Sequence, residues 1–465
     1  MSKLSVSIRM YRVGELGDCF YLKFAEGEKS CSVLIDCGSF RNGGKSVQRM
    51  REIAQHIADE QKEDALDVVV GTHQHNDHLS GFKHAKDIFL KLKAKQAWLS
   101  WLDDPEDKSA QKISRGEKEL TAKLRGIKTA ISDSKNAAFS NHIATERLND
   151  ILGFYLDGDA PAVPAEGLKI LKEMSSEVKY LQPGNQFSLP GMDEEVKVYV
   201  LGPPRNTKLL FDITAAKDES YDHKLKAADD NAQSFLKALS NFSNTGAADP
   251  DEDYFPFNNR LQKPICDDQF VKSTYNDVKN EWQRIDTDWL DQAGRLALYL
   301  DSYTNNTSLV LAFELVKSGK VLLFVGDAQT GNWLSWNDIL WQDKPSGFNV
   351  DNLLEKTVFY KVGHHCSHNA TLVAGLEKMN SEELVAMIPV DKNDPNITKK
   401  NGWKMPASNL HNRLKEKTKF RIIRMEDTYD KDCDPSLSNV AKESWSKLSG
   451  AVDSRSLYVE YTIKT

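Results

Sequence analysis

The sequence lacks three features that would assign it to a specialised class of protein. Its six cysteines form no CxxC pair and no regular framework, so we expect no disulfide scaffold and a reducing compartment. No run of about 18 apolar residues occurs, and the N-terminus MSKLSVSIRMYRVGELGD has no apolar signal core. We therefore expect a cytoplasmic protein that does not enter a membrane.

An excess of positive charge is also missing. The 61 lysines and arginines are outnumbered by 68 aspartates and glutamates, which gives a net charge of −7. This balance argues against a protein that coats nucleic acid, whereas a catalytic site that acts on nucleic acid needs only a local basic groove. With 40% hydrophobic and 28% charged residues over 465 positions, the chain has the composition of a soluble globular protein with a sizeable core.

Strand and helix patterns alternate through the first hundred residues. Strands are predicted by the β-forming or apolar runs LSVSIRM, CFYLKF, CSVLID, DVVVGT and QAWLSW. Helices are predicted by the amphipathic runs SVQRMREIAQHIADEQ and GFKHAKDIFLKLKA. This alternation predicts helices that cover a sheet.

Two segments interrupt this pattern. A helical insertion is predicted over residues 103–180, approximately. Two runs there are charged and helical in pattern: DPEDKSAQKISRGEKELTAKLRGIKTAIS and EGLKILKEMSSEVKYL. A second insertion is predicted at about 205–300, ending in the helical run EWQRIDTDWLDQAGRLALYL. Strands are predicted between and after the insertions by NQFSLPG, VKVYVLGPP, TSLVLAFEL, KVLLFVGDA, TVFYKVGHH, ELVAMIPV, KFRIIRM and SLYVEYTIK. We expect a single domain over residues 1–465 with two largely helical insertions.

Residues 72–82, THQHNDHLSGF, hold three of the eleven histidines within six positions, directly after an apolar strand. Alternate side chains of an extended segment share a face, so His73, His75 and Asp77 can converge on one point. His78 joins them if the chain turns into a helix there. Neutral imidazoles and a carboxylate are ligands that a divalent metal such as zinc prefers, so the motif predicts a metal site.

Two further polar groups also follow apolar strands. LLFVGDAQ places Asp327 after one strand, and YKVGHHCSHNA places His364 and His365 after another. Taken singly, each would be an ordinary turn residue or a packed imidazole. Together they supply what the first motif lacks, because a bridging carboxylate holds two cations about 3.5–4 Å apart and a further imidazole completes the second site.

Three motifs follow one another along the chain: HxHxDH after a strand, GD after a strand, and HH-x-S after a strand. In this order they resemble the motifs of the metallo-β-lactamase fold. Within it, GELGDCFYLKF, VLIDCGS, NNTSLVLAFEL and FYKVGHHCSHNAT are similar to the hydrolase domain of the DNA-internalisation protein ComEC and its free-standing relatives. The resemblance covers residues of about 5–100 and 180–425. It implies an α/β fold, an αββα sandwich, into which the two helical segments are inserted.

The resemblance also implies a role for each polar residue. The implied ligands are His73 and His75 for the first metal, Asp77, His78 and His365 for the second, and Asp327 as the bridge. His365 is preferred to His364 because it stands two residues before Ser367, which matches the family's H-x-S pattern. Asp36 resembles an outer-shell aspartate that steadies the His-rich loop, and Asp18 matches a turn at the rim of the site. The implied cofactor is Zn²⁺, with one or two ions, or alternatively Mn²⁺.

The sequence departs from the family pattern in three places. Cys366 stands where glycine is usual, and we interpret it as a small buried residue rather than a reactive thiolate. His368 stands where relatives often have a basic residue. The family also often supplies a third imidazole to the first metal from the middle of the chain, where this sequence has His142 and His223.

The implied reaction is hydrolysis by water that a metal activates, with Asp77 orienting the water and accepting its proton and His364 protonating the leaving group. The first hypothesis is a phosphodiesterase, either a nuclease or a nucleotide hydrolase. Its phosphate would be contacted by Lys361, His364, Ser367 and His368.

Two other functions remain open. The same metal core would serve a hydrolase of carboxyl esters, lactones or thioesters. Alternatively, the chain is a subunit of a larger assembly, with its helical insertions docked on a protein partner and a structural or regulated metal site. A bridging aspartate argues for catalysis, because a purely structural zinc site has closed four-ligand coordination.

Overall fold

The computed structural model describes residues 3–41, 43–62, 64–134, 143–155, 163–210, 269–274, 277, 279–280, 288–342, 347–400, 402–426, 435–448 and 451–465. Over these residues the protein is mixed α/β, with two mixed β-sheets. The chain divides into two compact units. Unit 1 comprises Met1–Glu117, Gly153–Lys226 and Asp301–Thr465, and unit 2 comprises Lys118–Leu152 and Ala227–Leu300.

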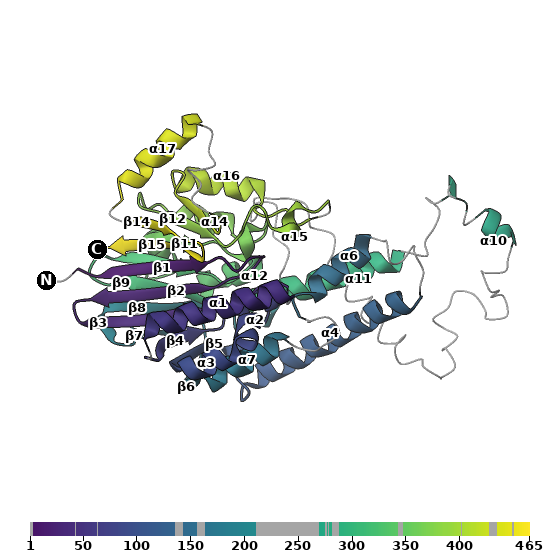
Figure 1. The fold of residues 1–465 in the computed structure, drawn as a ribbon, viewed down its shortest axis with the longest axis horizontal. Coiled ribbons are helices and arrows are strands. Elements are labelled where there is room, and N and C mark those ends of the chain that lie inside the picture. The colour runs from purple at the N-terminus through teal and green to yellow at the C-terminus, as the bar shows by residue number, and fades with distance from the viewer. Residues whose placement is uncertain are drawn as a thin grey trace. The chain divides into compact units, whose positions relative to one another are not determined.

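The first sheet of unit 1 has eight strands among the described residues, in the order β14-β15-β1-β2-β3-β4-β5-β6 (Figure 1). Its strands are β1 (Ser5–Tyr11), β2 (Phe20–Glu26), β3 (Lys29–Ile35), β4 (Leu66–Val70), β5 (Ala94–Ser100), β6 (Ser175–Leu181), β14 (Ala451–Ser454) and β15 (Tyr458–Lys464). β1, β2 and β3 are antiparallel neighbours, whereas β3, β4, β5 and β6 run parallel. The strands predicted in the first hundred residues are therefore confirmed.

The second sheet has seven strands within the same described ranges, in the order β13-β12-β11-β10-β9-β8-β7. Its strands are β7 (Gln186–Leu189), β8 (Met192–Gly202), β9 (Val310–Leu315), β10 (Lys320–Phe324), β11 (Thr357–Lys361), β12 (Val385–Ile388) and β13 (Ile422–Arg424). β7 to β10 are antiparallel neighbours, and β10 to β13 run parallel. The strands predicted by NQFSLPG, VKVYVLGPP, TSLVLAFEL, KVLLFVGDA, TVFYKVGHH, ELVAMIPV and KFRIIRM are therefore confirmed.

The two sheets pack face to face through aromatic side chains. The ring centroids of Phe20 and Phe324 lie 6.0 Å apart, and those of Phe24 and Phe313 lie 5.6 Å apart. The helices that add apolar side chains to the same continuous core are α1 (Gly44–Gln61), α2 (Asn76–His84), α3 (Lys86–Leu92) and α7 (Val163–Glu173). Helix α1 buries Met50, Ile53 and Ile57 as its predicted period requires.

The alternation of side chains along β11 directs one lysine into the interior. Phe359 packs in the core, with its ring centroid 5.2 Å from that of Phe324. Tyr360 points to the other face, where its ring meets Trp333 edge-on at 6.2 Å. Because successive residues of a strand alternate, Lys361 returns to the inner face and is almost fully buried.

One predicted helix is wrong in its second half. Residues 166–181 were expected to be helical, but α7 ends at Glu173 and residues 175–181 form β6. β6 pairs in parallel with β5 at the edge of the first sheet. Pairing with this long neighbour outweighs the helical propensity of the charged residues, and the β-forming Val178 and Tyr180 favour it locally.

The remaining described helices lie in both units. They are α4 (Lys108–Ser134), α6 (Ile143–Leu152), α8 (Thr207–Leu210), α10 (Gln269–Ser273), α11 (Asp288–Asn306), α12 (Thr330–Leu334), α13 (Asp351–Leu354), α14 (Val373–Lys378), α15 (Pro395–Thr398), α16 (Ser408–Lys417) and α17 (Pro435–Ser446). Unit 2 draws its residues from both predicted insertions. Among the described helices, none combines the length and the apolar character that crossing a bilayer would require.

Candidate metal centre

The predicted motif residues follow the ends of four strands of the two sheets. β3 and β4 of the first sheet end at Ile35 and Val70, and β10 and β11 of the second end at Phe324 and Lys361. Each pair runs parallel within its sheet, so both strands of a pair deliver the residues that follow them to one edge. This edge carries the candidate site.

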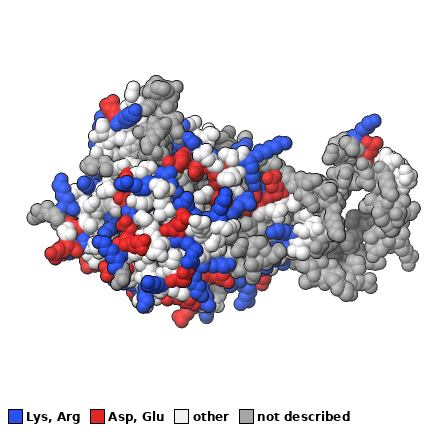
Figure 2. All heavy atoms as spheres, in the orientation of Figure 1, with Lys and Arg blue, Asp and Glu red and all other residues white. Residues whose placement is uncertain are grey.

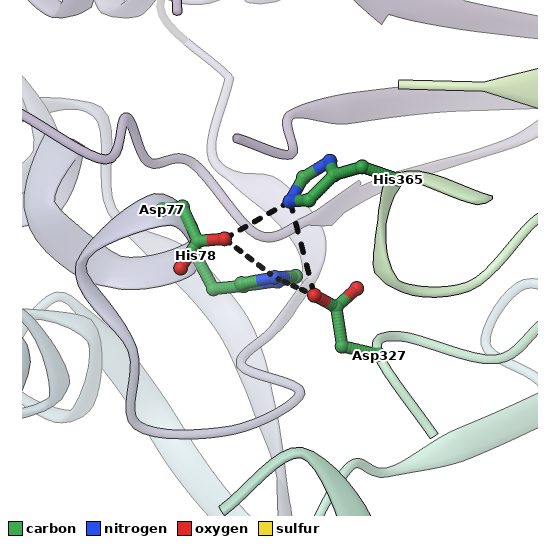
Figure 3. Close-up of side chains that lie close together, drawn as sticks. All are labelled: Asp77, His78, Asp327 and His365. Carbon is green, nitrogen blue, oxygen red and sulfur yellow. Dashed lines mark hydrogen bonds and ion pairs between the residues drawn. The ribbon is translucent and has the colours of Figure 1, made fainter. Parts of the chain in front are cut away.

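Asp77, His78, Asp327 and His365 form a compact, fully buried cluster (Figure 3). One ligand atom from each residue lies within 4.8 Å of the others. His365 Nε2 is 3.0 Å from Asp77 Oδ2, and His78 Nε2 is 3.2 Å from Asp327 Oδ2. Asp77 and His78 reach the cluster because α2 begins at Asn76, so the expected turn into a helix is confirmed. The cluster can hold a metal ion.

His73 and His75 form a second group beside this cluster. His73 Nε2 lies 3.1 Å from His75 Nδ1, and the ring centroid of His73 lies 4.1 Å from that of His78. Ligand nitrogens about 2.0–2.1 Å from a tetrahedral zinc ion lie roughly 3.3 Å apart, so two imidazoles at this spacing could share one ion. The two candidates for a third imidazole, His142 and His223, lie outside the described residues.

All four predicted ligand histidines bond one ring nitrogen outward. The other nitrogen faces the carboxylates of the cluster in His78 and His365, and the neighbouring imidazole in His73 and His75. The outward bonds are His73 Nδ1 to Ser308 Oγ (3.3 Å), His75 Nε2 to Tyr155 Oη (2.9 Å), His78 Nδ1 to Asp36 Oδ2 (2.7 Å) and His365 Nδ1 to the Pro389 carbonyl oxygen (2.8 Å). Metal-ligating histidines show this pattern, because the outer bond fixes the tautomer and orients the ring.

Several atoms at the centre are buried without a hydrogen bond among the described residues. They are His78 Nε2, Asp77 Oδ1 and Asp327 Oδ2. A buried polar atom that lacks a partner costs about 1–3 kcal/mol, and more when it is charged. A cation bound between His78 Nε2 and Asp327 Oδ2 would satisfy both of these atoms, so the residues present fit a metal ion.

No known protein family matches the chain, and no curated protein matches it. The function must therefore be inferred from the geometry of the site and the chemistry of its side chains.

Oppositely charged side chains lie together at the centre, and they lower the pKa of Asp327 and raise that of His78. Burial raises the pKa of Asp327, but His78 and Lys361 lower it more, so it lies well below its usual range. Burial lowers the pKa of His78, but the carboxylates of Asp327 and Asp77 raise it well above its usual range. Burial lowers the pKa of His75 to about 4, so its ring is a neutral ligand at neutral pH.

Asp36 forms hydrogen bonds with two residues of the His-rich loop, Thr72 and His78. Its Oδ1 accepts a hydrogen bond from the Thr72 backbone nitrogen at 2.8 Å, and its Oδ2 accepts one from Thr72 Oγ1 at 2.6 Å. The same Oδ2 holds His78 Nδ1. Asp36 therefore joins the end of β3 to the end of β4 and orients one candidate ligand.

Lys361 does not face a substrate. Its Nζ donates to the Gly326 carbonyl at 2.7 Å and to Asp327 Oδ1 at 3.2 Å, and it is ion-paired with Asp18 Oδ2. An ammonium group has three donors, and these three oxygens use all of them. The prediction that Lys361 contacts phosphate is therefore wrong: the alternation of β11 places the ammonium inside the site, where it balances two carboxylates.

His364 and His365 separate because the backbone turns sharply after β11. His364, His365 and Cys366 all have positive φ values, of 41°, 50° and 64°. His365 enters the cluster, whereas His364 Nδ1 faces Ser367 Oγ at 2.9 Å and Gln329 Nε2 at 3.0 Å. Burial lowers the pKa of His364 to about 3. An acid role for His364, and phosphate contacts by His364, Ser367 and His368, stay predictions.

Cys366 is a fully buried residue in a left-handed conformation. Burial raises the pKa of its thiol, which suits the interpretation as a small packed residue rather than a reactive thiolate. A φ of 64° favours glycine, which has no Cβ. The strain of a non-glycine residue here is of order 1–3 kcal/mol.

Sequence reasoning missed several residues that support the ligands. Tyr155 Oη bonds His75 Nε2 and donates to Thr304 Oγ1 at 2.8 Å. Ser308 Oγ contacts His73 Nδ1 and accepts from the Asp327 backbone nitrogen at 3.0 Å. Tyr155 falls in a segment predicted as an insertion, so no local pattern could reveal it. Ser308 lies within the NNTS run, which was singled out only as a resemblance.

Replacing Tyr155 by phenylalanine tests whether His75 depends on this outer bond. We expect Y155F to weaken metal binding at one site by about 10–100-fold, because the imidazole loses the group that fixes its tautomer. Competition with a chromogenic chelator measures this affinity. Tyr199, which bonds Glu314 on the second sheet, supplies the matched control Y199F. Equal affinities in Y155F and the wild type would show that the phenol does not orient the ligand.

Asp301 is a further buried carboxylate of α11. It is 7% exposed, and its Oδ2 accepts from Asn305 Nδ2 at 3.2 Å. Burial, reinforced by the charges of Asp77 and Asp327, raises its pKa well above its usual value. Asp301 is therefore harder to ionise than an exposed aspartate, and the charges of the centre contribute to this shift.

Proposed function

We propose that this protein is a metal-dependent hydrolase of the metallo-β-lactamase fold, with an αββα arrangement, that cleaves phosphodiesters. The observation that carries the proposal is the orientation of His78 and His365. Each turns Nε2 toward the buried carboxylates of Asp77 and Asp327 and bonds Nδ1 outward. Beside them, His73 and His75 turn one nitrogen toward each other and bond the other outward.

Two groups of ligands are available. His73 and His75 would hold one ion, and Asp77, His78 and His365 would hold the other. Asp327 would be the carboxylate that both ions share. Its Oδ1 is held by Lys361, and its Oδ2 faces His78 and His365. Imidazoles and carboxylates suit Zn²⁺ and also accept Mn²⁺. Such ions supply a nucleophilic water at neutral pH and stabilise charge that develops on a phosphoryl or carbonyl oxygen.

Residues of the chain would orient the water and accept its proton. Asp77 Oδ2 is engaged by His365, while Oδ1 accepts no hydrogen bond within the described part of the chain. This free oxygen can orient a water and accept its proton. Burial raises the pKa of Asp77, but His78 and His365 lower it below its usual value, so the carboxylate is ionised and ready to accept. Lys361 fixes Asp327 during this transfer.

The phosphodiester preference rests on the resemblance to the ComEC branch, and the alternative is a carboxyl ester, lactone or thioester. A substrate panel separates them. The purified protein would be assayed with Zn²⁺ or Mn²⁺ on single-stranded and duplex DNA, RNA, cyclic nucleotides, thioesters and lactones. Hydrolysis of thioesters or lactones alone would replace the phosphodiester proposal with its alternative. A role for the insertions in binding a protein partner, and the cytoplasmic location, stay predictions.

Replacing Asp77 by asparagine tests the proton-acceptor role. We expect D77N to lower kcat by about 10²–10⁴-fold, the usual contribution of general base catalysis. Metal content measured by mass spectrometry shows how much of the loss comes from a lost ligand. The matched control is D193N, which changes an exposed aspartate of β8. Wild-type activity of D77N on every substrate in the panel would refute a hydrolytic role for this site.

A further inference from the structure

A column of aromatic rings runs outward from the candidate ligand His75. The ring of His75 lies 5.1 Å from that of Phe154, and Phe154 stacks on Trp403 at 5.0 Å with an interplanar angle of 21°. Phe40 packs against both Phe154 and Trp403, at 4.5 and 5.3 Å. His75, Phe154 and Phe40 are buried, whereas Trp403 is partly exposed. The column therefore ends in an indole that solvent can reach.

The loop after α15 holds this indole in place. The Trp403 backbone nitrogen donates to the Asn396 carbonyl at 2.9 Å. A Cβ on Gly402 would lie 2.3 Å from the Ile397 carbonyl oxygen, so only glycine permits this close turn. Because the loop is packed this tightly, Trp403 is presented in a fixed position.

Basic side chains lie on the loop that carries the indole and over the neighbouring ring of Phe40, and Glu15 pairs with one of them, Arg41, at 3.6 Å. Lys400 and Lys404 are exposed on the same loop, and Arg41 lies 5.6 Å above the ring of Phe40. Asn396 Oδ1 accepts hydrogen bonds from Arg41 Nε and Nη2, at 3.2 and 2.9 Å, which fixes the guanidinium beside the column. On the face that Figure 2 shows, blue and red side chains are mixed, in the region where Figure 1 places α15 as elsewhere.

We infer that Trp403 stacks on an unpaired nucleobase, while Arg41 and Lys404 bind the phosphates joined to it. This inference rests on the proposed function, because two ring contacts, from Trp403 to Phe154 and from Phe154 to His75, separate the base-stacking indole from a candidate metal ligand. A nucleobase offers a π-face to an indole, and a positively charged surface follows the phosphate backbone. A partly exposed tryptophan, with exposed lysines on its loop and Arg41 over the ring beneath it, suits this ligand better than it suits packing alone.

The stacking requirement restricts the substrate class. A base within a duplex is covered on both faces by its neighbours, so an indole can stack only on an unpaired base. The ligand is therefore a nucleobase linked to a phosphodiester, found either in single-stranded nucleic acid or in a small nucleotide. The net charge of −7 agrees with this restriction, because one local basic patch meets a single strand more readily than it coats a duplex.

Binding without metal tests the inference separately from catalysis. Fluorescence anisotropy of a labelled oligothymidylate, and separately of a labelled dinucleotide, would be measured with the full-length protein in EDTA. We expect W403A to raise Kd on the order of tenfold, and W403F to restore most of the affinity because the ring is kept. We expect K404A to reduce the slope of log K against log salt by about 0.7, the value for one phosphate of a single strand. Tight binding of the dinucleotide alone would assign the site to small nucleotides.

Two chromogenic esters provide a matched measurement with Mn²⁺ present. One is the p-nitrophenyl ester of thymidine 5′-phosphate, and the other is methyl p-nitrophenyl phosphate. Both are phosphodiesters with the same leaving group, and only the first has a nucleobase. We expect the wild type to favour the nucleoside ester in kcat/KM, and W403A to reduce this preference about tenfold. R455A removes an exposed arginine of the β14–β15 turn and serves as the control for both measurements.

The outcomes separate the two proposals. If neither ester is cleaved but W403A still weakens oligonucleotide binding, the proposed reaction fails and the binding site stands. If both esters are cleaved equally and W403A binds like the wild type, the binding site fails and the reaction stands. If W403F is as weak as W403A, the indole supports the loop rather than a base, and the inference is overturned.

Discussion

Replacing Asp327 by asparagine is expected to remove metal binding and to lower hydrolysis by at least about a thousandfold, because metal ions contribute several kcal/mol of transition-state stabilisation. Asp327 is the carboxylate that both ligand groups would share. Its Oδ1 accepts from Lys361 Nζ and from the His364 backbone nitrogen, and its Oδ2 faces His78. An amide cannot balance two buried cations. Metal content and kcat on a chromogenic phosphodiester measure the two effects.

The same substitution should also destabilise the metal-free protein. Removing one partner of a buried charge pair costs about 3–5 kcal/mol, because the other charge stays buried. Urea unfolding of D327N in EDTA measures this cost, and D193N again serves as the control. A D327N protein that kept its metal content and its stability would show that Asp327 is an ordinary turn residue.

The sequence was a good guide to the candidate cluster because the ligands sit in short, dense motifs. His73, His75, Asp77 and His78 lie within six residues, and the strand before them and the helix after them have clear patterns. The partnership with Asp327 could be anticipated only from the order of the motifs. No local signal says that the ends of two different sheets meet, since that follows from how the sheets pack.

The parts that sequence reasoning missed depend on tertiary contacts. Lys361 looked like a surface cation beside the histidines, but its strand position turns it inward onto Asp18 and Asp327. Tyr155 follows α6, about 80 positions from the ring it supports, and nothing in its neighbourhood marks it. β6 was taken for helix because an edge strand depends on its neighbour for stability. In each case the partner, rather than the local sequence, decides the role.

Replacing Lys361 by methionine is expected to destabilise the protein by about 3–5 kcal/mol, because two buried carboxylates lose the ammonium between them. The side chain is 1% exposed, and its Nζ contacts Asp18, Asp327 and the Gly326 carbonyl. Methionine keeps the length and the apolar stem, so the effect is mainly that of the lost charge. Urea unfolding in EDTA measures it. If Lys361 instead bound phosphate, K361M would raise KM and leave stability unchanged.

A double substitution shows whether the loss comes from unpaired charge or from altered packing. Asp18 is buried, and Lys361 lowers its pKa, although burial raises it more. In D18N/K361M the ammonium and one of its carboxylates disappear together, leaving less charge uncompensated than in K361M. We therefore expect the double variant to be more stable than K361M, so that the two single costs do not add. Additive costs would show that Asp18 and Lys361 act independently, and the lysine would then be a packing residue rather than the cation that holds Asp327 in place.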